Sequence, residues 1–350
     1  MNKQILQISP YTFDHVWWVE KHAWMLQSIF HDEMYTIAGW GEFSIIEPVK
    51  HCPVPCFWKK WFFSLFSNIN TKTTRLIISH IRFAPTAWLA FLLAKKRGIP
   101  YVHVEHGSNF LIHNNSFIAF VSKIIDLTIW KIIIQNADYV ICVSQAGKEW
   151  VTKTFWRNQK ISVIYRGFEF KKIKRKRNSI PRIGLVGRLT WYKNADGLIR
   201  ALKKLENQAW ILNIVGEGEE QEKLENLVQE LSLEQRINFL WAKNHEWIMN
   251  EFYPSTDIVV NSSFQECLWT TIIEAIWMWC NVVATNTGGS LEIPWAFLVN
   301  PNEQGLLKWI RYYLKNINKI SHTNNKDIFY QKFSISSMKK NFSRIFSMFW

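Results

Sequence analysis

Two basic side chains follow a short apolar run near the middle of the chain. The run 183–186 leads into Gly187-Arg188-Leu-Thr-Trp-Tyr-Lys193, and the helix-like NADGLIRALKKL comes next. Arginine offers phosphate oxygens a planar fork of donors, and lysine offers a point charge. The N–H groups at a helix start favour an anion at the same place. The spacing favours phosphate binding by Arg188 and Lys193, although two solvated loop cations would give the same pattern.

Two carboxylates bracket the start of another expected helix. Glu266 precedes the helix-like segment 270–278, and Glu274 lies in its first turns. Ionised carboxylates accept hydrogen bonds from hydroxyl groups, so this pair suits a sugar or a ribose. A buried carboxylate near a helix start is also a common structural device. Between these two carboxylates and the basic pair, Val215-Gly216-Glu217-Gly218 follows a strand-like run, where glycine permits a tight turn and close approach of a ligand.

The elements that position these residues are predicted to be alternating strands and helices. In the first half, strand-like runs at 5–8, 76–81, 101–104 and 139–143 alternate with helix-like segments at 19–30 and 86–97. In the second half the rhythm restarts, with strands expected at 183–186, 210–215, 237–240, 258–261 and 281–284. Such alternation predicts parallel sheets covered by helices, in two doubly wound domains that face a cleft.

A basic run divides the two halves. Residues 171–180, KKIKRKRNSI, hold six Lys or Arg residues and little that could pack. We interpret the run as a solvated linker, with a basic arm for lipid headgroups or nucleic acid as the alternative. The predicted domains are residues 1–170 and 171–332. Residues 333–350 form a basic-aromatic helix that either docks back toward the first domain or lies on a membrane surface.

Composition narrows the class of protein. The 350 residues are 48% hydrophobic and 20% charged, which excludes a disordered chain. A net charge of +14 favours anionic partners such as phosphates, nucleic acid or an acidic membrane. Five cysteines argue against a disulfide-stapled secreted fold. The best apolar stretches are too short or too interrupted to span a bilayer, and the N-terminus lacks a signal peptide, so we expect a cytoplasmic protein, with peripheral membrane contact as an extension.

The order of these motifs resembles glycosyltransferase family 4. The order is GRLTxYKN, VGEGEE, FLxAKNHE, SSFQExLxTTIIEA and VVATNTGG, dense over residues 183–293, with thinner matches at 104–107 and 138–149. The resemblance implies a GT-B fold and a retaining transferase that moves a sugar from a nucleotide sugar, of the UDP or GDP type, to a glycan, lipid-linked or polysaccharide acceptor. It implies no metal, so His51, Cys52 and Cys56 are interpreted as loop packing.

The resemblance also implies roles for individual residues. Arg188 and Lys193 hold the donor diphosphate and neutralise the leaving group, since preorganised cations stabilise the charge that develops there. Glu266 contacts the donor sugar, Glu274 the ribose hydroxyls, and His106 lies near the transferred sugar; neither glutamate is a nucleophile. The remaining donor-binding positions implied are Gly187, Gly216, Leu268, Trp269, Thr270, Trp17 and Trp18.

Tryptophan stands where the family pattern has glycine. The chain has 20 Trp and only 14 Gly, against roughly 25 Gly at ordinary usage. The coincident positions are Trp17, Trp18, Trp241 and Trp279, with Trp269 at a position that is often Gly or Pro and Trp295 at one that looks similar. An indole fills space that a glycine loop leaves for phosphate, and tolerates positive φ poorly. We hypothesise that the gene uses UGA codons for glycine that have been read as tryptophan.

Three functions remain to be separated. The first is the retaining sugar transfer. The second is a non-catalytic scaffold of the same fold whose donor cleft is blocked by genuine tryptophans. The third is nucleic-acid binding, suggested by charge and aromatic content, but the sequence has no helix-turn-helix, zinc or RNA-binding motif to support it.

Overall fold

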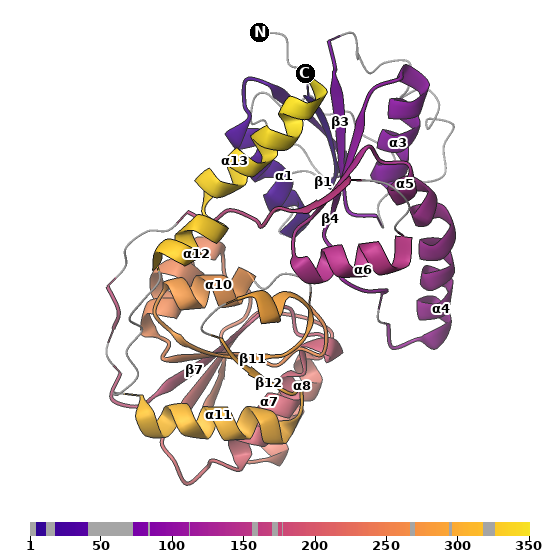
Figure 1. The fold of residues 1–350 in the computed structure, drawn as a ribbon. Helices are drawn as coiled ribbons and strands as arrows, with labels where there is room; N and C mark the ends of the chain where they lie inside the picture. The colour runs from indigo at the N-terminus through magenta and orange to yellow at the C-terminus, as the bar shows by residue number, and fades with distance from the viewer. Residues whose placement is uncertain are drawn as a thin grey trace. The chain divides into compact units, whose positions relative to one another are not determined.

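The structure is a computed structural model, and it divides the chain into two compact units. It describes residues 5–11, 18–40, 73–82, 85–111, 113–155, 160–169, 174–176, 178–266, 270–293, 296–317 and 326–350. Unit 1 comprises Met1–Glu169 and Asp327–Trp350, and unit 2 comprises Phe170–Lys326. Figure 1 shows a separate sheet in each unit.

Unit 1 is built on a parallel six-stranded sheet. Its spatial order is β2 (Met34–Trp40), β1 (Ile5–Tyr11), β3 (Leu76–His80), β4 (Tyr101–Glu105), β5 (Tyr139–Cys142) and β6 (Lys160–Val163). Every neighbouring pair is parallel. Strands β3, β4 and β5 are buried along their whole length, as expected of strands with helices over both faces. The strand order reverses between β1 and β3, so the loops after these strands diverge there.

Helices cover both faces of this sheet. They are α1 (Trp18–Ile29), α3 (Pro85–Arg97), α4 (Ser116–Ile125), the π-helical turn η1 (Asp126–Trp130), α5 (Lys131–Gln135), α6 (Gln145–Phe155), α12 (Lys326–Phe333) and α13 (Ile335–Phe346). Side chains of α3, α5 and α6 share one core cluster with the sheet. Helix α13 lies beside α1 (Figure 1), where the Phe346 ring lies 5.0 Å from the Phe30 ring, so its apolar side is covered by protein.

Unit 2 has a second parallel six-stranded sheet. Its order is β12 (Phe297–Val299), β11 (Asn281–Thr285), β10 (Ile258–Asn261), β7 (Arg182–Val186), β8 (Ile211–Val215) and β9 (Ile237–Phe239). The chain leaves β7 for β8 and β9, and then returns to pair β10 with the other side of β7. The order therefore reverses between β7 and β10, which is the point where open α/β sheets bind ligands.

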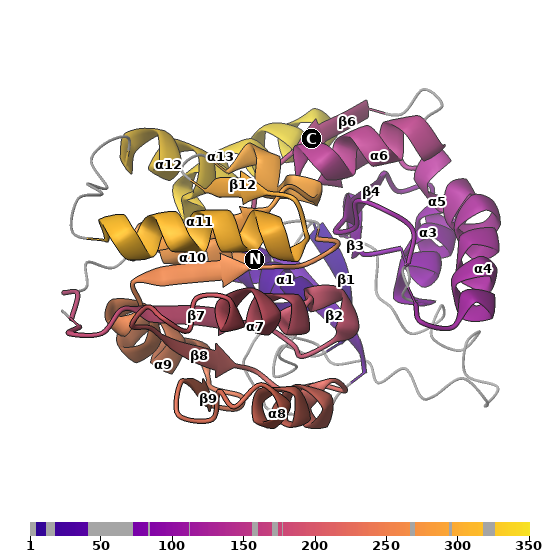
Figure 2. The ribbon, with the colours of Figure 1, turned by 90° about the horizontal axis from the view of Figure 1, so that it is seen from below.

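The unit 2 sheet is also covered on both faces. Helices α7 (Ala195–Lys203), α8 (Gln221–Glu230) and α11 (Glu303–Asn316) lie on one side, and α10 (Thr270–Trp277) lies on the other (Figures 1 and 2). The short elements are η2 (Trp191–Lys193), α9 (His245–Trp247), η3 (Ile248–Phe252), η4 (Tyr253–Ser255) and η5 (Gly288–Glu292). Trp210 is 1% exposed and belongs to the core cluster of this unit.

The fold class predicted from the sequence is confirmed, but several elements were missed. Two parallel sheets with helices match the predicted pair of doubly wound domains. The prediction left out β2, β6, β12 and the helices α4, α5, α6, α11 and α12. The stretch 116–134 was considered only as a membrane span, which Lys123, Asp126 and Lys131 argued against, and no helix was predicted there. In the structure Asp126 is buried and paired with Arg82, so the interruption is itself part of the packing.

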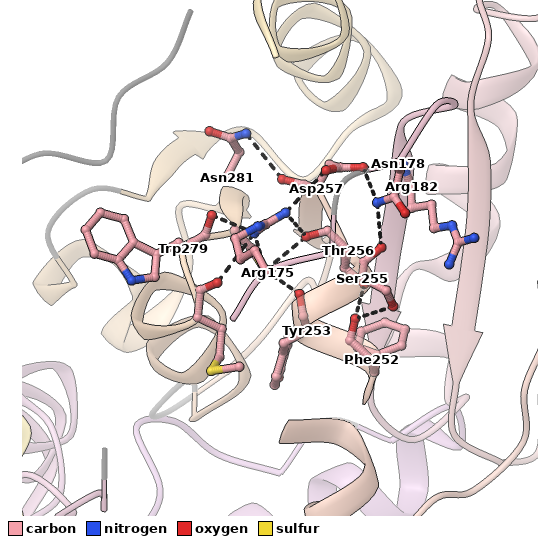
Figure 3. A network of polar contacts seen from close by, with 12 residues as sticks. Arg175, Asn178, Arg182, Phe252, Tyr253, Ser255, Thr256, Asp257, Trp279 and Asn281 are labelled. Carbon is pink, nitrogen blue, oxygen red and sulfur yellow. Dashed lines mark hydrogen bonds and ion pairs between the residues drawn. The ribbon is translucent and has the colours of Figure 1, made fainter. Parts of the chain in front are cut away.

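One residue of the basic run, Arg175, packs against unit 2, whereas Lys174 and Lys176 are exposed as expected of a solvated linker. Arg175 donates from Nη1 to the carbonyl oxygen of Trp279 at 2.6 Å, and from Nη2 to that of Thr256 at 2.7 Å (Figure 3). Asp257 accepts from Arg175 Nη2 at 3.2 Å and from Asn178 Nδ2 at 2.9 Å. The predicted solvated run is wrong for Arg175, because its guanidinium satisfies carbonyl groups at the end of α10 and before β10.

Candidate active site

Two positions in the loop after β8 lie too close to the backbone of the loop after β7 to carry a side chain. A Cβ built on Gly216 would lie 1.9 Å from the Gly187 carbonyl oxygen, and one on Gly218 would lie 2.3 Å from the Leu189 carbonyl oxygen. Gly187 and Gly216 have φ of +155° and +138°, which L side chains rarely adopt. Glycine is therefore required where the two strand ends meet, at the carboxyl edge of the sheet.

Lys193 and Glu266 form an ion pair at the reversal point between β7 and β10. Lys193 ends the turn η2, and its Nζ pairs with Glu266 Oε1. A Cβ on Gly187 would lie 3.9 Å from that Nζ, so the ammonium group lies over the glycine turn. Both side chains are about one-fifth exposed, at 21% and 18%, which leaves them within reach of a ligand.

Backbone contacts hold these two residues in place. Ser262 Oγ donates to the Lys193 carbonyl at 2.7 Å, and Asn194 Nδ2 donates to the Ser262 carbonyl at 3.1 Å. Ser263 Oγ, which also lies 2.8 Å from Asn261 Oδ1, lies 3.1 Å from Glu266 Oε1. Since these bonds join the loop after β7 to the loop after β10, the sheet order brings together residues about 70 positions apart.

Arg188 joins this group through a tyrosine. Its side chain is exposed, and Nη2 donates to the Tyr192 hydroxyl at 2.9 Å. The Tyr192 ring lies 5.8 Å from Lys193 Nζ, so the two cations border one aromatic side chain. Tyr192 was quoted in the sequence motif but given no role, because an aromatic residue in a loop carries no chemical signature.

Glu274 has a different environment from Glu266. It is 4% exposed on α10, where Oε1 lies 2.9 Å from His245 Nε2 and Oε2 accepts from the Tyr253 hydroxyl at 3.1 Å. Burial, followed by the charge of Glu274, raises the pKa of Tyr253 well above its usual value, so the phenol stays a donor. Each carboxylate oxygen keeps a second lone pair that can accept a further hydrogen bond. His245 and Tyr253 were missed, because their spacing from Glu274 is set by tertiary structure alone.

Of the remaining predicted site positions, the structure describes the side chain of Thr270, whereas most of the others lie outside the described residues. Thr270 is buried as the first residue of α10. Trp18 begins α1, and its side chain lies outside the described residues, as do Trp17, Leu268, Trp269, Trp295, His51, Cys52 and Cys56. Among the residues that the structure describes, no group of three or more His, Cys, Asp or Glu side chains could hold a metal ion.

His106 follows β4 in unit 1, beside two other histidines. His80 Nδ1 lies 3.3 Å from His106 Nε2, and the His22 ring lies 5.0 Å from the His106 ring. Burial lowers the pKa of His106 to about 4, with His103 and Arg166 adding to the effect and Glu105 opposing it. His106 is therefore neutral at pH 7. His22 and His80 were not predicted as part of the site.

A buried ion cluster supports the loop that carries His106. Arg82 donates to Glu105 Oε1 at 2.8 Å and to Asp126 Oδ1 at 3.0 Å, and all three side chains are fully buried. Gly107 N–H also donates to Glu105 Oε1, at 2.5 Å. Burial acts to raise the pKa of Glu105, but Arg82 and His103 outweigh it and hold the pKa at about 2. The carboxylate therefore stays ionised and anchors the turn after β4.

Comparisons with known proteins identify the family of this chain. A family model for glycosyl transferases group 1 matches residues 168–323, and a model for Glycosyltransferase Family 4 matches residues 47–172. The chain belongs to glycosyltransferase family 4. An uncharacterized glycosyltransferase of Methanocaldococcus jannaschii is 29% identical over 324 residues, which is 86% of this chain and 82% of that protein. The family resemblance expected from the sequence is thus confirmed.

The chain is also similar to a human enzyme subunit and to solved glycosyltransferase structures. One component of human phosphatidylinositol N-acetylglucosaminyltransferase is 27% identical over 226 residues, covering 62% of this chain and 45% of that protein. Anabaena HepE in complex with UDP and glucose superposes with a TM-score of 0.81 at 18% identity, covering 99% of each chain. Sucrose-phosphate synthase from Thermosynechococcus elongatus gives the same TM-score, identity and coverage. These structures confirm the GT-B fold.

Proposed function

We propose that this glycosyltransferase moves a sugar, with retention of anomeric configuration, from a UDP- or GDP-sugar to a glycan, lipid-linked or polysaccharide acceptor. The observation that carries the proposal is the Lys193–Glu266 pair over the glycine turn, at the point where the order of the unit 2 strands reverses. A cation, a carboxylate and close backbone approach at that point suit a diphosphate joined to a sugar.

In the proposed reaction, the bond from the anomeric carbon to the diphosphate oxygen breaks as negative charge builds on the leaving group. Lys193 and Arg188 stabilise that charge. The acceptor oxygen forms its bond on the same face, and its proton passes to the departing phosphate oxygen. Glu266 orients Lys193 and accepts from sugar hydroxyls, and Glu274 accepts from the ribose. Gly187 and Gly216 admit the diphosphate, and Leu268, Trp269, Thr270, Trp17 and Trp18 are proposed to line the donor.

The donor and acceptor classes draw on the relatives. HepE is described as binding UDP and glucose, which supports a nucleotide-sugar donor for this chain. The human relative is named for transfer to phosphatidylinositol, and this supports a lipid-linked acceptor. The proposed place of action is the cytoplasmic face of a membrane.

Membrane contact is proposed through α4, η1 and the start of α5. No helix in the described part of the chain is both long and apolar enough to cross a bilayer. Helix α4 buries none of its residues, and Phe117 and Phe120 are 71% and 61% exposed. The exposed apolar surface is formed by Phe117, Ile118, Phe120, Val121, Ile124, Ile125, Leu127, Ile129 and Ile132. Lys123 and Lys131 lie within the same stretch, as suits an anionic lipid surface.

Nucleotide binding tests the proposed donor site. We expect Lys193→Ala to weaken binding of UDP or GDP by about tenfold or more, because a hydrogen bond to a charged group contributes about 1.5–3 kcal/mol. The matched control is Lys223→Ala, which removes an exposed ion pair with Glu220 in the same unit. Calorimetric titration measures both. Equal affinity of Lys193→Ala and the control would contradict the proposed site.

The identity of Trp241 and Trp279 decides between an enzyme and the scaffold alternative. We propose that both are glycine in the native protein, encoded by UGA. Their φ values are +59° and +61°, a region that costs a bulky L-residue about 1–2 kcal/mol. Trp241 also lies beside the glycine turn, since its carbonyl accepts from Gly216 N–H at 3.1 Å. Peptide masses of natively expressed protein test this; UGG codons at 241 and 279 would overturn it and favour the scaffold.

A further inference from the structure

A chain of hydrogen bonds runs through the interior of unit 1 and ends at His106. Its members are Gln27, Thr36, Gln7, His80 and His106, and the first four are buried. They come from α1, β2, β1, β3 and the turn after β4. Two of these strands, β1 and β3, flank the point where the strand order reverses.

Backbone carbonyls determine the direction of the chain at its start. Gln27 Nε2 donates to the Met34 carbonyl at 2.9 Å, so Gln27 Oε1 accepts the Thr36 hydroxyl proton at 2.6 Å. Because a hydroxyl has one proton, Thr36 Oγ1 accepts from Gln7 Nε2 at 2.7 Å. Gln7 Nε2 also donates to the Ala23 carbonyl at 2.9 Å. A carbonyl oxygen can only accept, so the orientation of the Gln7 amide is determined twice.

The same logic assigns the protons of two histidines. Gln7 Oε1 lies 2.9 Å from His80 Nε2 and has no proton, so His80 Nε2 donates. A neutral imidazole carries one proton, so His80 Nδ1 is an acceptor and His106 Nε2 donates to it at 3.3 Å. The remaining ring nitrogen of His106, Nδ1, then carries a lone pair. In the described part of the chain, this nitrogen has no hydrogen-bond partner.

We propose that Gln7 and His80 are positioning residues that keep His106 in its Nε2–H form, so that Nδ1 accepts a hydrogen bond from a hydroxyl group of the sugar substrate. The substrate part rests on the proposed function. Ligands of parallel α/β sheets bind beyond the carboxyl ends of the strands, which is where His80 and His106 lie.

The surroundings keep both rings neutral. Burial, and then His106 and His103, lower the pKa of His80 well below its usual value. The groups that act on His106 are His22, His80, His103, Glu105 and Arg166. Only Glu105 opposes the lowering, and it is committed to Arg82. Protonation of His106 would turn Nδ1 into a donor, so activity should fall only as pH drops toward about 4.

The proton position is measured directly by nitrogen NMR. Full-length protein labelled with ¹⁵N in its histidine rings gives distinct shifts for protonated and unprotonated ring nitrogens. We expect the Nε2–H form for both His80 and His106 at pH 7. An Nδ1–H form of His106 would overturn the proposal, whatever the activity of the protein.

Gln7→Leu tests the direction of the chain. It removes the acceptor for His80 Nε2, so the His80 proton should move to Nδ1 and force His106 into the Nδ1–H form. We expect kcat to fall by about tenfold with KM little changed, because one hydrogen bond made to the sugar as it reacts is lost. The matched control is Thr36→Val, which is equally buried but leaves the Gln7–Ala23 bond and thus the direction intact.

The outcomes separate this inference from the proposed function. An unchanged His106 form in Gln7→Leu, or equal loss of kcat in Gln7→Leu and Thr36→Val, would overturn the positioning role. Wild-type protein that shows the Nε2–H form but transfers no sugar from any nucleotide sugar would overturn the proposed function and, with it, the substrate hydroxyl. Nucleotide binding in unit 2 provides the independent readout of the donor site.

Discussion

At the scale of single residues, three helices are followed by a residue whose backbone has positive φ, although the three side chains differ in type. Gly98, Ser232 and Trp279 each follow a helix with φ between +52° and +64°. At each, the next residue's N–H bonds back to a carbonyl five positions earlier, as in Ile99 to Ala94, Leu233 to Val228 and Cys280 to Ala275. This is the Schellman arrangement, which favours glycine at that residue. The chain therefore holds one glycine, one serine and one tryptophan at equivalent positions.

The three positions give a stability prediction. Trp279→Gly should raise the free energy of unfolding by about 1 kcal/mol, because glycine adopts positive φ without strain. Ser232→Gly should act in the same direction by a similar or smaller amount, and Gly98→Trp should destabilise. Denaturant unfolding measures all three. A loss of stability in Trp279→Gly would show that indole packing outweighs the backbone strain, and would count against glycine as the native residue.

Residue types alone gave the polar members of the proposed donor site but not their partners. Arg188, Lys193, Glu266 and Glu274 have spacings that suit phosphate and sugar chemistry. His245, Tyr253, Ser263 and Tyr192 complete the contacts, yet their spacing has no local meaning because the sheet order brings them there. Gln7 and Thr36 could not be predicted for the same reason. A polar residue in a strand carries no local signal of the residue it will contact in the folded protein.

At the scale of elements, α4 is the one that departs most from a globular helix. Its exposed apolar surface contrasts with α13, whose apolar side chains Met338, Phe342 and Phe346 are buried. Figure 2 shows α4 at the outer edge of unit 1, away from the sheet. Of the two segments with apolar and basic residues, the structure thus leaves α4 as the better candidate for a lipid surface.

Vesicle binding tests the role of α4. Phe117→Asp with Phe120→Asp should weaken partitioning onto vesicles rich in phosphatidylglycerol by roughly tenfold or more, because it removes apolar burial and adds negative charge. The matched control is Trp24→Asp, an exposed aromatic residue on α1. Co-sedimentation with the vesicles measures both. If the two variants bind equally, α4 does not contact the membrane; if neutral vesicles bind as well as anionic ones, the lysines contribute nothing.

At the scale of the whole molecule, the two units differ in their response to acid. In unit 1, burial lowers the pKa of His22 and His80 well below the usual value, and that of His106 to about 4. Glu105, with a pKa of about 2, adds a second contribution to the loss of unit 1 stability at lower pH. Among the described residues of unit 2, the shifted pKa values belong only to Lys223, Tyr253, Cys280 and Tyr313, which titrate in the alkaline range.

The sign of the pH dependence follows from these shifts. A histidine with a lowered folded pKa binds its proton more readily when unfolded, so its contribution to stability is present above about pH 6.5 and is lost as pH falls. Each histidine that stays neutral in the fold should lower the free energy of unfolding of unit 1 by about 2 kcal/mol at pH 5. Hydrogen exchange followed by mass spectrometry, at pH 7.5 and 5.0 with rates corrected for pH, should show lost protection in unit 1 only. An equal loss in both units would contradict the assignment.

The sequence by itself determined the layered parallel architecture and the residue types of the proposed donor site. Apolar runs of strand length and amphipathic helices are local patterns, and glycine, arginine and glutamate mark loops by chemistry that does not depend on their neighbours. Only the tertiary structure decided which loops meet, that Arg175 is a packing residue, and which way the protons of His80 and His106 face. The physical reason is that hydrogen bonds and desolvation act between atoms in contact, and contact between residues such as Gln7 and His80 is created by the order of strands in the sheet.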